Sequence, residues 1–153
     1  MTVADRLKEL GITLPPPATP GGNYTPANRV HNTLYVAGQL PTQDGELISP
    51  GKVGADVTVE QATEAARIAT LNALSAVENA LDGGLDAIES VTRITVFVNA
   101  VPDFDQHSIV ANGASDLLVA VLGDAGRHAR NAIGMGSLPR GSCVEVETNF
   151  KVR

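Results

Sequence analysis

Apolar residues recur at helical spacing in three segments of the chain. In the longest, Thr58 is followed three residues later by Gln61, a capping box that predicts a helix start, and Gly83-Gly84 predicts the helix end. The apolar positions between them are mostly alanine, which favours close packing against a sheet. The three predicted helices are the stretch from Thr58 to Gly83, Ser108–Leu122, and a short helix from a Thr2 cap to Leu10.

Five other segments have the composition of β-strands. The dipeptide His31-Asn32 separates two of them and predicts a hairpin. In Val91–Asn99 both faces are apolar near the end, which predicts a strand in the centre of a sheet. The predicted strands are Tyr24–Val30, Thr33–Gln39, Val91–Asn99, Arg130–Gly136 and Ser142–Val152. Between the elements, Pro-rich Ile12–Asn23 predicts an extended connector, polar Leu40–Val57 a loop, and Leu85–Ser90 a short helical turn.

The order of these elements is ββαβαββ, which predicts an α/β (α+β) domain whose mixed sheet carries both main helices on one face. We divide the chain into an N-terminal helix and connector, residues 1–23, and a single domain, residues 24–153. In the last strand, the valines that alternate with Glu145 are predicted to face the helices. Arg130 shares a face with Ala132. If that face is the uncovered one, a large cation lies among small residues, which suits a partner subunit or a pocket.

Composition narrows the class of protein. The chain has 153 residues, 43% of them hydrophobic, which fits one soluble globular domain. Its single cysteine, Cys143, excludes an intrachain disulfide, and its three histidines are too scattered for a zinc pattern. A net charge of -6 weighs against a nucleic-acid partner. The N-terminus lacks the features of a secretory signal, and no apolar run reaches the roughly 18 residues of a membrane span, so we expect a cytoplasmic protein with no membrane partner.

Two groups of motifs resemble the RidA/YjgF family. Near the C-terminus, His128-Ala129-Arg130-Asn131-Ala132-Ile133 is followed by Leu138-Pro139 and then by Val144-Glu145-Val146-Glu147. This run is similar to the family's arginine strand, Leu-Pro turn and Glu-bearing strand. Near the N-terminus, Tyr24 and the segment Tyr35–Pro41 resemble the family's first hairpin, which ends in a small residue followed by Gly-Gln-(Ile/Leu)-Pro. The resemblance covers roughly residues 24 to 153. The N-terminal helix and extra residues around Asp105–Ala111 suggest a longer subfamily.

The resemblance implies a chorismate-mutase-like fold assembled as a homotrimer, with sites in clefts between subunits. It implies hydrolytic deamination of small reactive 2-imino or enamine acids to 2-oxo acids and ammonia, with no metal or organic cofactor. Arg130 suits the substrate carboxylate, because its planar guanidinium donates two parallel hydrogen bonds. Glu145, expected on a neighbouring strand, suits orienting the attacking water or moving a proton. The substrate-binding candidates are Tyr24, Gly38, Asn112 and Ala132.

Most of these residues also have a structural interpretation. Arg130 comes just after a predicted helix C-terminus, where the helix dipole favours a cation. Glu145 alternates with valines, as a solvated strand residue does. Tyr24 suits either the core or a lid over the substrate. Asn112 suits a helix cap, and Gly38 suits a turn.

The sequence departs from the family pattern at Ala37 and Ala132, where the family often has a hydroxyl group and a thiol or other small polar group. This departure favours an alternative function, a non-catalytic metabolite-binding or regulatory trimer that uses the same cleft. A further alternative is an endoribonuclease, against which the acidic balance weighs. A nucleophilic pair of Cys143 and His128 requires the two side chains to lie close together.

Overall fold

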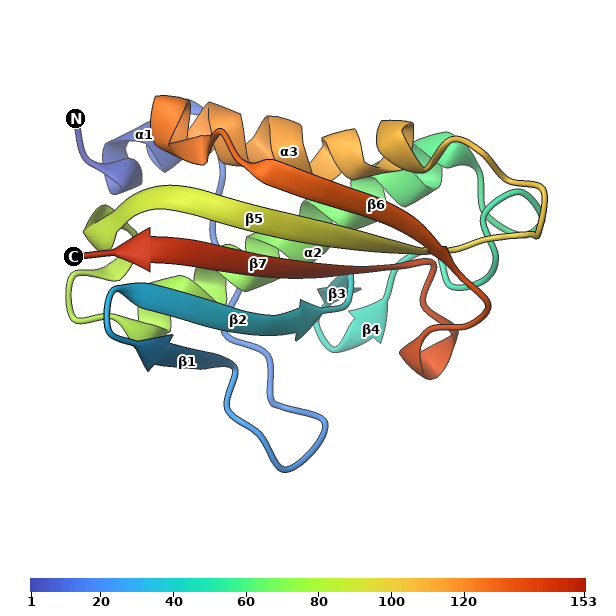
Figure 1. Ribbon diagram of the computed structural model, residues 1–153, viewed down its shortest axis with the longest axis horizontal. Helices are drawn as coiled ribbons and strands as arrows, with labels where there is room; N and C mark the ends of the chain where they lie inside the picture. The colour runs from blue at the N-terminus through green and yellow to red at the C-terminus, as the bar shows by residue number, and fades with distance from the viewer.

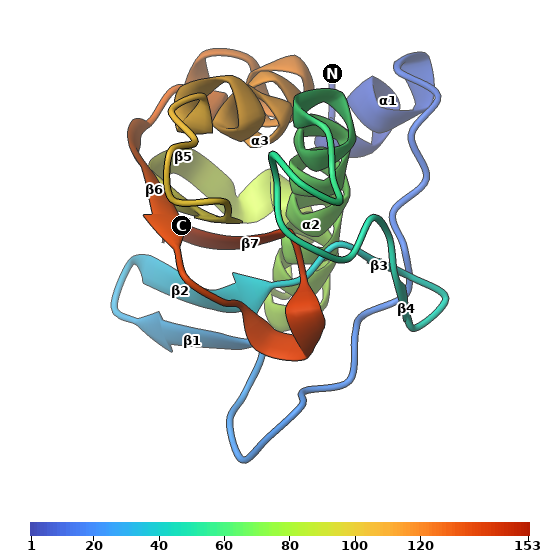
Figure 2. The ribbon, with the colours of Figure 1, turned by 90° about the vertical axis from the view of Figure 1, so that its right-hand side faces the viewer.

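A five-stranded sheet forms one layer of the molecule and two long helices form the other, in a computed structural model that describes all 153 residues (Figure 1). The helices and strands in chain order are α1 (Val3–Glu9), β1 (Ala27–Val30), β2 (Thr33–Gln39), β3 (Thr42–Gln43), β4 (Glu46–Leu47), α2 (Val59–Ala80), β5 (Ile88–Asn99), α3 (His107–Leu122), β6 (Ala129–Met135) and β7 (Val144–Val152). Figure 2 shows α2 and α3 together on one side of the sheet. The predicted mixed sheet with both main helices on one face is confirmed.

The strands lie in the order β1-β2-β7-β5-β6. Neighbouring strands are antiparallel except β5 and β6, which are parallel and are joined through α3, the crossover that a parallel pair requires. The prediction that Val91–Asn99 is an interior strand is confirmed, because β5 lies between β7 and β6. The strand begins earlier than predicted, at Ile88, directly after a 3-10 turn, η1 (Gly84–Ala87).

Two hairpins precede α2 in the chain. The predicted hairpin at His31-Asn32 is confirmed, since Val30 pairs with Thr33 and His31 has a positive φ of 55°. The prediction of a plain loop over Leu40–Val57 is wrong in part, because β3 and β4 pair there around Asp44-Gly45. Both turn residues have positive φ, at 52° and 80°, which is the geometry that an Asp-Gly hairpin turn favours.

The core lies between the sheet and the two long helices. The capping box at Thr58 and Gln61 is present, and the buried side of α2 is largely alanine, as the sequence predicts. These small residues let α3 approach closely: a Cβ atom added to Gly113 on α3 would lie 2.0 Å from the carbonyl oxygen of Thr63 on α2. The largest fully buried side chains are Phe150, Leu34, Leu74, Ile94 and Leu118.

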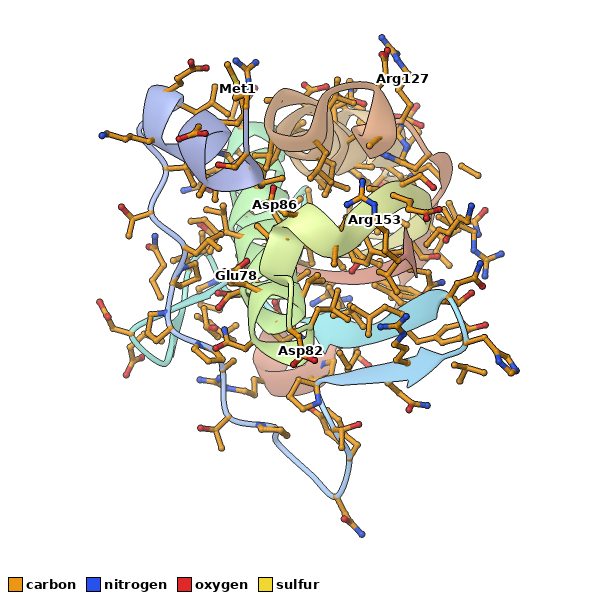
Figure 3. The ribbon with its side chains drawn as sticks, turned by 90° about the vertical axis from the view of Figure 1, so that its left-hand side faces the viewer. Met1, Glu78, Asp82, Asp86, Arg127 and Arg153 are labelled. Atoms are coloured by element: carbon orange, nitrogen blue, oxygen red, sulfur yellow. The ribbon has the colours of Figure 1, made fainter.

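The N-terminal helix packs against its own chain. Leu7 is 8% exposed and belongs to the core cluster. The backbone N–H of Val3 donates to the carboxylate of Asp86, labelled in Figure 3, at 2.8 Å. Arg6 donates through Nε to the carbonyl of Ala120 on α3 at 2.8 Å. The connector that follows is attached to α2, since the Ser75 hydroxyl donates to the carbonyl of Pro15 at 2.6 Å. These contacts fix α1 and the start of the connector on the domain.

One stretch, His107–Gly126, is long and apolar enough to cross a membrane by length and composition alone, with a mean hydropathy of 1.3. By this criterion the expectation that no segment could span a membrane does not hold. Its α3 helix packs against α2 and the sheet and buries Val110, Leu117 and Leu118. A core helix of a small soluble domain has this composition for that reason, and the architecture is that of such a domain.

Candidate functional site

The two faces of the sheet carry different residues of the candidate site. Arg130 pairs with Ile94, and Ala132 pairs with Val96, both of which are buried beneath the helices. Paired residues of parallel strands point to the same side, so Arg130 and Ala132 lie on the helix side of β6. A Cβ atom on Gly134 would likewise meet His107 of α3 at 2.7 Å. The idea that this is the uncovered face is therefore wrong.

Arg130 is held by three residues of α3. Its Nη1 donates to the side-chain oxygen of Asn112 at 2.8 Å and to the hydroxyl of Ser115 at 3.2 Å, and its Nη2 donates to the carbonyl of Ser108 at 3.3 Å. A guanidinium has five N–H donors, and these bonds use both hydrogens of Nη1 and one of Nη2. Nε has no acceptor within the chain and Nη2 has only one, so these two nitrogens, both bonded to Cζ, can still donate to a ligand.

This geometry excludes the helix-terminus interpretations of two site residues. Ser108 is the second residue of α3, so the guanidinium lies beside the N-terminal part of that helix, where the dipole disfavours a cation. Arg130 thus does not stabilise a helix C-terminus. Asn112 is not a helix cap either, because Gln106 occupies the N-cap position and Asn112 lies in the second turn. Arg127, by contrast, extends away from the molecule and pairs with exposed Asp124 (Figure 3).

A serine and a histidine that the sequence analysis did not connect with Arg130 complete this group. The Ser115 hydroxyl lies 2.9 Å from Nε2 of His128, and Nδ1 of His128 lies 2.5 Å from the carbonyl oxygen of Gly126. The sequence positions of Ser115 and His128 relative to the candidate residues indicate that both lie near Arg130. Ser115 is three residues after Asn112 and so lies on the same side of α3, and His128 precedes Arg130 by two residues in the approach to β6. His128 is paired with Ser115 and not with Cys143, so the suggested Cys143–His128 pair is not formed.

A separate cavity of about 770 Å³ contains three other predicted site residues, Tyr24, Gly38 and Glu145. Tyr24 is 52% exposed, which excludes the core interpretation of this residue. Gly38 has no positive φ, but a Cβ atom there would lie 2.7 Å from a carboxylate oxygen of Glu145. Glycine at this position therefore admits the carboxylate of Glu145 and does not serve a turn. The Pro-rich connector and Arg140 line the cavity as well.

The side chains of Glu145 and Cys143 have pKa values above the usual ones. Burial, and secondly the neighbouring carboxylate of Glu147, raise the pKa of Glu145 above the usual carboxyl value. Such a group can donate a proton nearer to neutral pH than an ordinary carboxyl. Burial raises the pKa of the Cys143 thiol to about 11, and the side chain is fully buried. Cys143 is therefore a protonated core residue at neutral pH and has no nucleophilic role.

The structure does not bring the two groups together within one chain. Glu145 pairs with Phe97 on the open face of the sheet, opposite the helices, whereas Arg130 lies on the helix side. The expectation that Glu145 lies on a strand next to Arg130 is also wrong, because β5 separates β7 from β6. One chain therefore presents a guanidinium with two available donors at one place and a carboxyl of raised pKa in a cavity at another.

These features define the class: an α+β domain with two helices on one face of a mixed sheet and a guanidinium held at the edge strand. The chain belongs to the RidA/YjgF family, since the family model described as "YjgF/chorismate_mutase-like, putative endoribonuclease" matches residues 4–148. The matched region includes most of α1 and the whole connector. The fold is the chorismate-mutase-like fold of that family.

Three relatives show the range of similarity. Protein TCP17 of Trypanosoma cruzi is 44% identical over 146 residues, which cover 95% of this chain and 91% of that protein. The crystal structure of Atu1372 from Agrobacterium tumefaciens is 44% identical, with a TM-score of 0.91 over 99% of this chain and 92% of that chain. RidA from an Antarctic Psychrobacter is 27% identical, with a TM-score of 0.61 over 92% of this chain and 96% of that chain.

Proposed function

We propose that this protein hydrolyses small, reactive 2-imino or enamine acids to 2-oxo acids and ammonia. Membership of the RidA/YjgF family supports this reaction class. The observation that carries the proposal is the environment of Arg130. Its guanidinium is fixed by Asn112, Ser115 and Ser108 yet keeps Nε–H and one Nη2–H for a ligand. Two donors on nitrogens that share Cζ match the two oxygens of a carboxylate.

The placement of Arg130, besides joining β6 to α3 through three hydrogen bonds, supports binding of an anion. A cation beside the first turn of a helix opposes the helix dipole. An anion bound at the same point would be attracted by both the guanidinium and the dipole. In this proposal Arg130 holds the substrate carboxylate, and the carboxyl of Glu145, whose pKa is raised by burial, moves a proton during the attack of water on the C=N carbon.

The distance between these groups along the sheet leads us to propose a homotrimer with its sites between subunits. In each site, Arg130, Asn112 and Ala132 of one copy would face the cavity that contains Tyr24, Gly38 and Glu145 of a neighbour. The open face of the sheet supports association, because Tyr35 and Ile133 are 50% and 45% exposed there. Light scattering should give three times the 15.8 kDa mass of one chain. A monomeric mass would contradict this part of the proposal.

The alternative is a non-catalytic trimer that binds a metabolite in the same cleft. It is favoured by Ala37 and Ala132, which offer no side-chain hydroxyl or thiol to a reacting group. The third possibility is the endoribonuclease activity that the family description names. The net charge of -6 weighs against it, because binding of a phosphate backbone depends on Lys and Arg side chains. A reducing, cytoplasmic location fits the free thiol of Cys143.

The test couples the purified protein to an amino-acid oxidase that releases imino acids, and measures the rate of ammonia formation. The wild-type protein should accelerate the release. Arg130→Ala should lower kcat/KM at least about 100-fold, because two hydrogen bonds to a charged group are worth roughly 1.5–3 kcal/mol each. Arg130→Lys should recover only part of the rate, since an ammonium lacks the planar fork.

Arg127→Ala is the matched control, because that arginine is exposed and pairs only with exposed Asp124. It should behave as wild type. Saturable binding of a 2-oxo acid without any acceleration of ammonia release would favour the non-catalytic alternative. Equal activity of Arg130→Ala and wild type would refute the role of Arg130.

A further inference from the structure

A directed chain of hydrogen bonds leads from Arg130 into the body of the domain. It ends at Gly126 in the 3-10 turn η2 (Gly123–Gly126), which packs on the last turns of α3. Gly126 is buried, and a Cβ atom there would lie 2.2 Å from the carbonyl oxygen of Leu118. Only glycine allows this approach, so the carbonyl of Gly126 has a fixed position relative to α3.

The position of that carbonyl determines which nitrogen of His128 carries a proton. A carbonyl oxygen only accepts, so Nδ1 of His128 must be the donor in the 2.5 Å contact with Gly126. In the neutral ring, Nε2 is then the acceptor and receives the hydroxyl hydrogen of Ser115 at 2.9 Å. The Ser115 oxygen keeps its lone pairs and accepts from Nη1 of Arg130 at 3.2 Å. Every donor in this chain meets an acceptor, in the order Arg130, Ser115, His128, Gly126.

We propose that Ser115 and His128 are positioning residues that set the plane of the Arg130 guanidinium for a substrate carboxylate. This inference rests on the proposed function. An arginine side chain loses roughly 2 kcal/mol of rotamer freedom when it is ordered, and that loss is avoided at the moment of binding if the side chain is ordered beforehand. Asn112 is exposed and is a weaker anchor alone. The Ser115 hydroxyl, held in turn by His128, fixes the second hydrogen of the same Nη1.

A serine hydrogen-bonded to a histidine also resembles a nucleophile with its general base. The surroundings of Ser115 do not support that role. Ser115 lies in the middle of α3, where backbone N–H groups are bonded along the helix, so the local backbone offers no donors to a tetrahedral oxyanion. The oxygen of Ser115 is instead directed to a guanidinium that the proposed reaction uses. The positioning role is therefore the better account of the pair.

The test measures binding of pyruvate, the probe acid, and of pyruvamide, which lacks the carboxylate, to the full-length protein by calorimetry. Ser115→Ala should weaken pyruvate binding about three- to tenfold, as expected for one lost hydrogen bond next to a charged group, and leave pyruvamide binding unchanged. Ser115→Thr keeps the hydroxyl and should bind pyruvate within about twofold of wild type. In the coupled imino-acid assay, Ser115→Ala should raise KM and leave kcat nearly unchanged.

His128→Ala gives an independent measurement at a half-buried position outside the core. It should weaken pyruvate binding in the same direction, and Ser115→Ala combined with His128→Ala should be no weaker than the worse single variant, because both act through one chain of contacts. Wild-type affinity for pyruvate in both single variants would overturn the positioning role and leave the proposed function intact. Covalent labelling of Ser115 by a fluorophosphonate would overturn it in favour of a nucleophile. A wild-type protein with neither pyruvate binding nor imino-acid turnover would refute the proposed function itself.

Discussion

Gly113 links the packing of the helices to the site, because it lies on α3 between Asn112 and Ser115, which both hold Arg130. A Cβ atom at this position would lie 2.0 Å from the carbonyl oxygen of Thr63, whereas real Cβ contacts are essentially never below 3.0 Å. The obstacle is backbone, so a side-chain rotation cannot relieve it. Gly113→Ala must therefore move α3 away from α2 by about 1 Å.

Two opposing terms determine the size of this effect. Alanine in place of glycine stabilises a helix interior by about 1 kcal/mol, while overpacking of a well-packed contact costs about 1–3 kcal/mol. A backbone clash of this severity belongs at the upper end, so we expect a net loss of about 2 kcal/mol. That loss corresponds to a decrease in Tm of roughly 4–8 °C for a domain of this size. The displaced α3 should also weaken pyruvate binding, since the partners of Arg130 move with it.

Urea denaturation and calorimetry of Gly113→Ala measure both consequences. Asp116→Ala, at an exposed position of the same helix, is the control and should change stability by no more than about 0.5 kcal/mol. A Gly113→Ala variant as stable as wild type or more stable would show that helix propensity outweighs the contact. The close approach of α2 and α3 would then not be what fixes the partners of Arg130.

Three further predictions concern single buried groups. The Thr148 hydroxyl is buried without a hydrogen-bond partner, so Thr148→Val should raise stability by about 1 kcal/mol in urea denaturation, and a loss would contradict this. Burial and Glu147 raise the pKa of Glu145 in the folded state. Glu145→Gln should therefore match wild type in stability at pH 4 or below and exceed it increasingly as the pH rises through the raised pKa. A constant difference in stability across a pH series would refute this linkage. Buried Cys143, with its pKa raised to about 11, should resist iodoacetamide at pH 8 until urea unfolds the chain, and mass spectrometry showing alkylation of the native protein would be inconsistent with that burial.

The sequence predicted those elements whose signals are local. Thr58 and Gln61 are three residues apart, and a capping box needs nothing else to form. The hairpin at His31-Asn32 depends on the same short range. The Asp44-Gly45 hairpin is harder to predict, although its dipeptide is a strong turn signal, because the surrounding strands have only two residues each. Local chemistry therefore accounts for most of the fold.

The arrangement of the site depends on tertiary contacts that spacing does not contain. Alternation along β6 shows that Arg130 and Ala132 share a face, but not which face α3 covers. The separation of Glu145 from Arg130 follows from the strand order, which places β5 between their strands. Ser115 and His128 are 13 residues apart on a helix and in the approach to a strand, and only the crossover from α3 to β6 brings them together. Residue types identified candidates for the site, and the topology determined their neighbours.

In the proposed homotrimer, each site combines Arg130 of one copy with Glu145 of another. This arrangement is tested by mixing Arg130→Ala with Glu145→Gln chains, unfolding and refolding them together, and measuring the mixture in the imino-acid assay. Each variant refolded alone should be inactive, and wild type should recover its rate. With random assembly of shared sites, about a quarter of the sites receive an intact Arg130 and an intact Glu145 from different copies, so the mixture should regain about a quarter of the wild-type rate. A mixture that forms trimers yet stays inactive would contradict a site shared between subunits.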